Sequence, residues 1–168
     1  MGYSQEIYLE QRFTPKIKAI LGCQFITQVV DHDLHNATDF ETFIVKPFTV
    51  GVRLRRFKYY RAFKDQFTIR WAVSSGAMTE IDKIRSGLVD YILYGFVNKE
   101  EDKIIQYFIG DLTLFRKNEP KPVGIFDNGP GDSKLAAYSL NALPPEFVLK
   151  FWTADKRDGT IGRPSALE

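Results

Sequence analysis

The stretch that decides the fold spans residues 49–64 and reads TVGVRLRRFKYYRAFK. Apolar side chains alternate with glycine or arginine over its first half, and a period of two is typical of a strand whose two faces differ. We therefore predict a strand over Thr49 to Arg55. Its apolar face carries Val50, Val52 and Leu54, and its other face carries Gly51, Arg53 and Arg55.

The same stretch is strongly basic. Six cations lie within twelve consecutive residues with no acid among them: Arg53, Arg55, Arg56, Lys58, Arg61 and Lys64. Aromatic residues are interleaved with these cations: Phe57, Tyr59, Tyr60 and Phe63. Cations neutralise phosphates and aromatic rings stack on unpaired bases, so this composition favours a nucleic-acid surface. The alternative interpretation is a solvated hairpin whose aromatic side chains belong to the core.

Patterns on either side of this stretch predict further helices and strands. Before it, apolar spacing predicts a helix from Ser4 to about Gly22, split in two or kinked at Pro15, and then a strand over Phe40 to Val45. After it, we predict a strand over Phe67 to Trp71, a helix capped by Thr79 and Asp82, and two antiparallel strands over residues 89–97 and 103–109. Ile81, Ile84 and Leu88 would form the apolar face of the capped helix.

The remaining third of the chain gives weaker patterns. We expect a short helix over residues 112–117, a loop over 120–132 and a helix over 144–153 that starts on its prolines. The chain of 168 residues has the size of one domain, which we place at 1–154, followed by a flexible tail over 155–168.

Composition narrows the class of protein further. The net charge is only +2, so a nucleic-acid partner has to be argued from the local charge of residues 53–64. A single cysteine, Cys23, excludes a disulfide framework and a multi-cysteine zinc site, which fits a reducing compartment, and the cytoplasm is the expected location. No stretch approaches the ~18 apolar residues of a membrane span, so no membrane partner is expected.

Carboxylates occur near the predicted strands. Asp39 opens the strand at Phe40, and Glu41 falls on the same face. A divalent cation held by carboxylates can orient a water and neutralise a scissile phosphate, so Asp39 is a candidate metal ligand. The loop before it also holds His32 and His35, a weaker candidate for a metal cluster.

The order helix, strand, strand, strand, helix, strand over residues 4–109, with Asp39 at a strand start ahead of the Arg53 strand, resembles the restriction-endonuclease-like PD-(D/E)XK nuclease superfamily. The resemblance implies a single α/β domain with an αβββαβ core and a mixed central sheet flanked by helices. The core would occupy about 4–109, with a C-terminal elaboration over 110–154. The implied activity is hydrolysis of DNA phosphodiester bonds with Mg²⁺ or Mn²⁺.

The superfamily's motif can be carried across residue by residue. Asp39 matches the first acid, and Gly51-Val52-Arg53 stands in the place of the acid-x-Lys triplet, where glycine lacks a carboxylate and arginine replaces lysine. An alternative register uses Thr68-Ile69-Arg70. Some members supply the missing acid from the following helix, where this chain has Glu80 and Lys83. The resemblance thus implies Asp39 and Glu80 as metal ligands, with Lys83 and Arg53 completing the catalytic set; Glu6 is a weaker match to an acid on the first helix.

Three functions are consistent with these features. The first is a metal-dependent endonuclease of phage or mobile-element type, acting on DNA rather than RNA and, by analogy with the superfamily, as a homodimer. The second is a non-catalytic module of the same fold that binds nucleic acid or a partner protein through Arg55, Arg56, Lys58, Arg61 and Lys64. The third uses the aromatic-rich surface for oligomerisation or for phage or mobile-element assembly.

Overall fold

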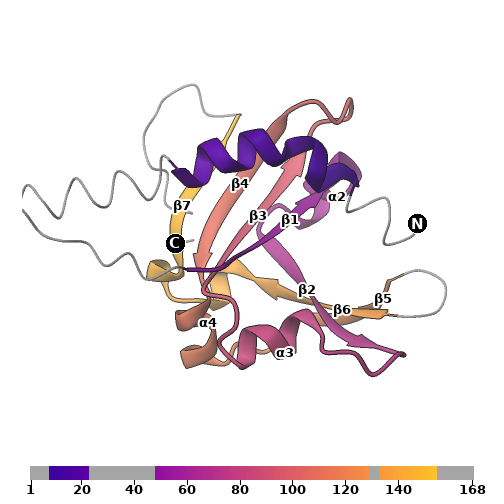
Figure 1. The fold of residues 1–168 in the computed structure, drawn as a ribbon, viewed down its shortest axis with the longest axis vertical. Coiled ribbons are helices and arrows are strands. Elements are labelled where there is room, and N and C mark those ends of the chain that lie inside the picture. Colours follow the sequence, from indigo (N-terminus) through magenta and orange to yellow (C-terminus); the bar gives the residue numbers. More distant parts are fainter. Residues whose placement is uncertain (1–7, 23–47, 129–132, 155–168) are drawn as a thin grey trace, which may run out of the picture.

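The computed structural model describes residues 8–22, 48–128 and 133–154, which form a mixed α/β fold (Figure 1). Four strands form a mixed sheet in the order β1-β3-β4-β7: β1 (Val50–Arg55), β3 (Tyr91–Val97), β4 (Ile104–Asp111) and β7 (Val148–Thr153). β1 is parallel to β3, and the other two pairs are antiparallel. An antiparallel sheet has the order β2-β6-β5: β2 (Gln66–Val73), β6 (Ser133–Ser139) and β5 (Gly124–Asp127).

A helix over residues 8–22 covers one face of the four-stranded sheet (Figure 1). Its buried side chains Leu9, Phe13 and Ile17 pack against Leu54, Leu93, Val97, Ile104 and Ile109. The predicted apolar face of β1 is confirmed, because Val50, Val52 and Leu54 belong to this cluster.

The same helix runs through Pro15 without interruption, so the predicted pair of short helices is wrong. Pro15 is exposed, and water can satisfy the carbonyl that lacks a donor. Burial of these three large apolar side chains contributes about 1.5–3 kcal/mol each. Their summed contribution exceeds the ~3 kcal/mol cost of a proline inside a helix.

The opposite face of the four-stranded sheet packs on the three-stranded sheet through an aromatic core. Phe67 of β2 is fully buried at its centre, 5.6 Å from the ring of Phe108, 5.6 Å from Tyr138 and 5.7 Å from Phe147. β3 is buried on both faces, since Leu93 and Tyr94 belong to different clusters. This explains the continuous apolar run that predicted it.

The basic run forms β1 and a helix, α2 (Phe57–Phe63), so the hairpin of the alternative interpretation is wrong. Two of its aromatic residues, Tyr59 and Tyr60, do pack against the core, as that interpretation expected. β1 and β2 lie in different sheets, so the chain between them crosses from one sheet to the other and cannot make a tight turn. The helix is anchored by Tyr60, whose ring lies 5.5 Å from Phe96 of β3. Its other side carries the run's exposed cations.

Two further helices flank the sheets as predicted. α3 (Glu80–Arg85) begins with the predicted capping box, in which Thr79 and Asp82 bond each other's side chain and backbone N–H. Leu88 was expected on its apolar face but is 56% exposed, because the helix ends at Arg85 and the chain turns at Gly87 with φ of 76°. α4 (Leu112–Asn118) follows β4 directly, and the Asp111 carboxylate accepts from the Thr113 backbone N–H.

The C-terminal third differs most from expectation. The predicted loop contains β5, and β6 was not predicted. In place of the helix over residues 144–153 there is one 3-10 turn, Pro145–Phe147, followed by β7, which pairs with β4. The predicted strand at residues 40–45, Glu6, the acids and histidines of residues 31–41, and the tail lie outside the described residues.

The predicted fold class is therefore confirmed in its general features, which are a mixed α/β domain with a mixed sheet and flanking helices. In the described segments, no helix is long and apolar enough to cross a bilayer.

Candidate nucleic-acid interface

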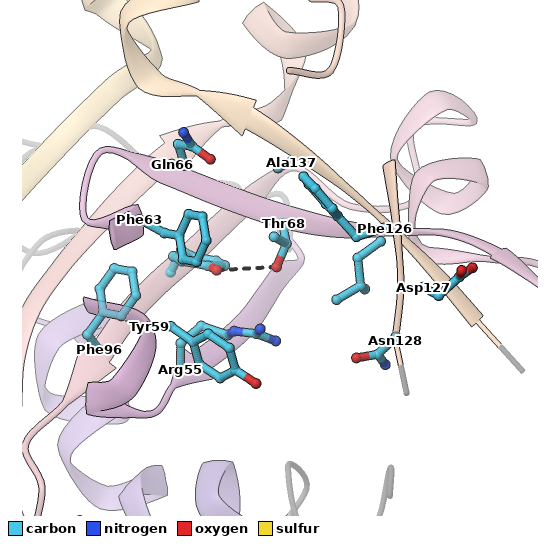
Figure 2. A pocket seen from close by; sticks show the side chains of 12 residues that line it. Arg55, Tyr59, Phe63, Gln66, Thr68, Phe96, Phe126, Asp127, Asn128 and Ala137 are labelled. Atoms are coloured by element: carbon cyan, nitrogen blue, oxygen red, sulfur yellow. Dashed lines mark hydrogen bonds between the residues drawn. The ribbon is translucent and has the colours of Figure 1, made fainter. Parts of the chain in front are cut away.

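A pocket of about 240 Å³ lies between α2 and the β5-β6 side of the three-stranded sheet. Tyr59 and Phe63 of α2 line one side, while Phe126 and Asn128 line the other (Figure 2). Figure 2 also shows Arg55 beside Tyr59, with the hydrogen bond between Thr68 and the Tyr94 hydroxyl marked by a dashed line. Aromatic and polar groups thus share one cavity.

Arg55 is the cation of this pocket. Its side chain leaves β1 on the face opposite the apolar cluster, its guanidinium carbon lies 4.4 Å from the centre of the Tyr59 ring, and the residue is only 8% exposed. Burial raises the pKa of the neighbouring Tyr94 phenol above its ordinary value of 10.0, and Arg55 offsets part of that rise. Tyr94 is therefore a neutral hydroxyl at physiological pH, 3.2 Å from the Thr68 Oγ1.

The opposite wall is built by the end of β5. Phe126 is 55% exposed, and its ring lies over Gly124, where a Cβ would stand 2.5 Å from the ring's Cζ. Asn128 is anchored by its backbone N–H, which donates to the Ser133 carbonyl, and by its side-chain amide, which donates to the Ser133 hydroxyl. Figure 2 shows the amide oxygen of Asn128 turned toward Arg55.

The five cations of the basic run other than Arg55 divide into two groups. Arg53 donates to Glu80 at 2.6 Å and Arg56 donates to Glu101 at 2.7 Å, so an internal acid partly neutralises each. Lys58, Arg61 and Lys64 are exposed on α2 and its C-cap, and the Lys58 ammonium lies 4.9 Å from the Tyr59 ring centre. The exposed positive charge therefore lies on α2, beside the pocket.

Glu80 is placed where β1, β2 and α3 meet. Its Oε2 accepts from the Arg53 guanidinium at 2.6 Å and from the Arg70 backbone N–H at 3.0 Å. The two candidate registers thus meet at this carboxylate in different ways, Arg53 through its guanidinium and Arg70 through its backbone N–H. The side chains of Arg53 and Glu80 are 11% and 25% exposed, so water reaches the carboxylate.

Of the described members of the expected catalytic set, Arg53 bonds this carboxylate, whereas Lys83 lies three residues after Glu80 on the same helix and makes no ion pair with it. Lys83 is exposed on α3. Asp39 lies outside the described residues. Within residues 8–22, 48–128 and 133–154, no group of three or more His, Cys, Asp or Glu side chains is arranged to hold a metal ion. Glu80 is the one expected metal ligand among those residues.

Sequence reasoning missed the β5 wall of the pocket. Phe126 and Asn128 fall in the stretch read as a loop, and they meet α2 only because β5 pairs with β6 and β6 with β2. The usable signal was the alternation of Gly124, Ile125 and Phe126, which puts a small residue beneath an aromatic one on the same strand face.

Comparisons of the chain with protein-family models, with curated proteins and with solved structures found no match.

Proposed function

We propose that this protein binds nucleic acid across α2 and the adjoining pocket. The observation that carries the proposal is the juxtaposition of three exposed cations, Lys58, Arg61 and Lys64, with an aromatic pocket that contains a buried arginine. Phosphates supply the charge that such cations neutralise, and bases supply the rings that aromatic side chains stack on.

This arrangement of cations and aromatic rings suits nucleic acid better than a surface that only carries charge would. Lysine and arginine at spacings of three along a helix share one side, so one backbone strand can contact them together. Arg55 is held over Tyr59 next to this side. A solvated helix that served only solubility would not require a cation and aromatic rings to be gathered in a cavity beside it.

The test is binding of a fluorescently labelled oligonucleotide at low salt, measured by anisotropy. The Lys58→Gln, Arg61→Gln, Lys64→Gln variant should bind at least tenfold more weakly than the unaltered protein. A matched control removes three exposed lysines elsewhere, on α4, after it and on β7: Lys117→Gln, Lys121→Gln, Lys150→Gln. Equal weakening in both variants would show that net charge alone matters and would refute the proposed interface.

Metal-dependent hydrolysis of DNA phosphodiester bonds is a second candidate function. The observation that favours it is the position of Glu80, which bonds Arg53, two residues from Arg55 on the same face of β1. A strand rises about 3.3 Å per residue, so the backbone of Arg53 lies about 7 Å along β1 from that of Arg55, which lines the pocket. In this proposal Asp39 and Glu80 hold Mg²⁺ or Mn²⁺, Lys83 contacts the attacking water or a phosphate, and Arg53 stabilises the charge that develops on the phosphate.

The two functions separate experimentally. Single- and double-stranded DNA are incubated with the protein and Mn²⁺ or Mg²⁺, and with the Asp39→Ala variant beside it. The nuclease proposal predicts cleavage that needs the metal and is lost in Asp39→Ala while DNA binding persists. Binding without cleavage of any DNA form, or cleavage that Asp39→Ala leaves intact, would contradict it.

A further inference from the structure

We infer that the pocket between α2 and β5 takes one unpaired nucleobase, so that the protein prefers single-stranded nucleic acid to duplex. This inference rests on the proposed nucleic-acid binding and adds which form is bound and which residues select it. It is carried by three features of the pocket: its size, its facing aromatic rings and the polar groups at its rim.

The size suits a single ring system. The cavity of about 240 Å³ is smaller than the ~300–1,000 Å³ of pockets that enclose drug-sized ligands. Solvent reaches the pocket at Phe126, a lining residue that is more than half exposed. A base attached to a continuing backbone can enter such a pocket while the sugar and phosphates remain outside.

The aromatic side chains stand on opposite walls. Tyr59 and Phe63 come from α2, and Phe126 comes from β5, with open space between the two sides in Figure 2. Each ring offers a face or an edge to a base, and stacking of this kind tolerates any of the four bases because all have a π-face. Phe126 is more than half exposed although its ring is large and apolar, which a base would cover.

Charged and polar side chains that line the pocket, Arg55, Asn128 and the exposed carboxylate of Asp127, offer donors and acceptors to the edge of a base. The guanidinium of Arg55 carries five N–H donors, so it can donate to a base in addition to its protein contacts. Across the pocket, the side-chain nitrogen of Asn128 is used by Ser133, which leaves its oxygen as an acceptor on the Arg55 side. A base edge carries both acceptors and donors, so it can bond a donor and an acceptor of the pocket together.

A duplex cannot use this pocket as it stands. A paired base has its edge occupied and both faces stacked on neighbours, so it enters only after unpairing, at a cost of a few kcal/mol. A single strand avoids that cost and still presents phosphates to Lys58, Arg61 and Lys64. The same surface therefore discriminates between the two forms.

The structure suggests two variants that alter the Phe126 wall of the pocket and one matched control. Phe126→Ala removes one wall, and because the side chain is 55% exposed the change spares the core. Gly124→Ala keeps Phe126 but displaces its ring, since the new Cβ would lie 2.5 Å from it. Ile125→Ala is the matched control, a 46% exposed apolar residue on the same strand that does not line the pocket.

The experiment uses a short DNA oligonucleotide with one 2-aminopurine, offered single-stranded or annealed to its complement. With the unaltered protein we expect tighter binding of the single strand and a change in 2-aminopurine emission on binding. Phe126→Ala and Gly124→Ala should weaken single-strand binding about tenfold and reduce the emission change, while Ile125→Ala leaves both as they were. The melting temperature of each variant shows that the fold is intact.

Three results would overturn the inference, and they differ in what else they overturn. Salt-sensitive binding that is equal for single strand and duplex, and indifferent to Phe126→Ala, refutes the base pocket while the proposed function stands. Absence of binding to either DNA form at low salt refutes both. A purified protein captured at this surface in place of DNA, with its binding lost in Phe126→Ala, would likewise contradict the inference.

Discussion

Replacing Glu80 by glutamine tests whether this carboxylate ties the two sheets together. Its Oε2 joins the Arg53 guanidinium of β1 to the Arg70 backbone N–H of β2, and Glu80 itself begins α3. Glutamine keeps the shape and an acceptor oxygen for Arg70 but removes the negative charge that faces Arg53. The variant therefore isolates the ion pair.

The expected cost follows from the exposure of the pair. Ion pairs in full contact with water contribute about 0.2–1 kcal/mol, whereas removing one partner of a buried pair costs about 3–5 kcal/mol. The Arg53 and Glu80 side chains are 11% and 25% exposed and the nitrogen–oxygen distance is 2.6 Å, which places the pair between these limits. We expect Glu80→Gln to lower the free energy of unfolding by about 2 kcal/mol.

Urea denaturation followed by tryptophan fluorescence measures this change, since Trp71 lies on β2 and Trp152 on β7. A loss of this size lowers the melting temperature by about 4–8 °C in a protein of this length. A double-mutant cycle with Arg53→Met should give a coupling energy above about 1 kcal/mol. Lys83→Gln, an exposed position on the same helix, is the control and should change stability by less than about 0.5 kcal/mol.

A Glu80→Gln variant as stable as the unaltered protein, with a coupling energy to Arg53 near zero, would contradict this role of the ion pair. Glu80 would then be a carboxylate that contributes nothing to the fold, and its presence at the meeting point of β1, β2 and α3 would require a functional explanation such as metal binding.

Two further predictions concern the core and the cap of α3. Gly110→Ala should destabilise the protein by about 1–3 kcal/mol, because the new Cβ would lie 2.6 Å from the buried Phe147 ring, while Gly51→Ala meets its nearest neighbour only at 3.5 Å and should be nearly neutral in the same denaturation assay. Thr79→Ala should cost about 1 kcal/mol through loss of the cap. Hydrogen bonds from the Thr79 hydroxyl and backbone N–H lower the pKa of Asp82 below 3.8, so the capping box stabilises at neutral pH and that contribution is lost as the pH falls below 3.8 through the folded-state pKa. Unfolding free energies measured from neutral to acid pH should show a weaker acid dependence in Thr79→Ala, and an unchanged dependence would contradict this role.

Local patterns predicted the elements whose causes are local. The alternation of β1, the apolar run of β3 and the Thr79–Asp82 capping box all describe what the structure contains. The division into two sheets was not predictable in the same way, since strands next to each other in sequence, β1 and β2, pair with partners far along the chain.

The C-terminal errors have identifiable physical causes. β6 contains the buried pair Ala136 and Ala137, whose small side chains hide the period of two. Pro144 and Pro145 are typical of a helix start, yet they open only one 3-10 turn because Phe147 is pulled into the aromatic core and β7 then pairs with β4.

In the candidate site, too, only the features with local causes could be predicted from the sequence. The sequence predicts the basic run and its aromatic residues, but which cations stay exposed depends on acids 27 and 45 residues away, Glu80 for Arg53 and Glu101 for Arg56. The pocket's second wall, at Phe126, comes from a different sheet than Arg55. Tertiary pairing therefore leaves fewer exposed cations than the sequence alone indicated.

The most direct test of nucleic-acid binding at α2 is the salt dependence of the association constant for a single-stranded oligonucleotide. Each phosphate contact contributes about 0.7 to the slope of log K against log salt for single strands, so neutralising Lys58, Arg61 and Lys64 together should reduce the slope by about 2. The variant without Lys117, Lys121 and Lys150 should keep the slope of the unaltered protein. Identical slopes for all three proteins would contradict the assignment of this surface to nucleic acid.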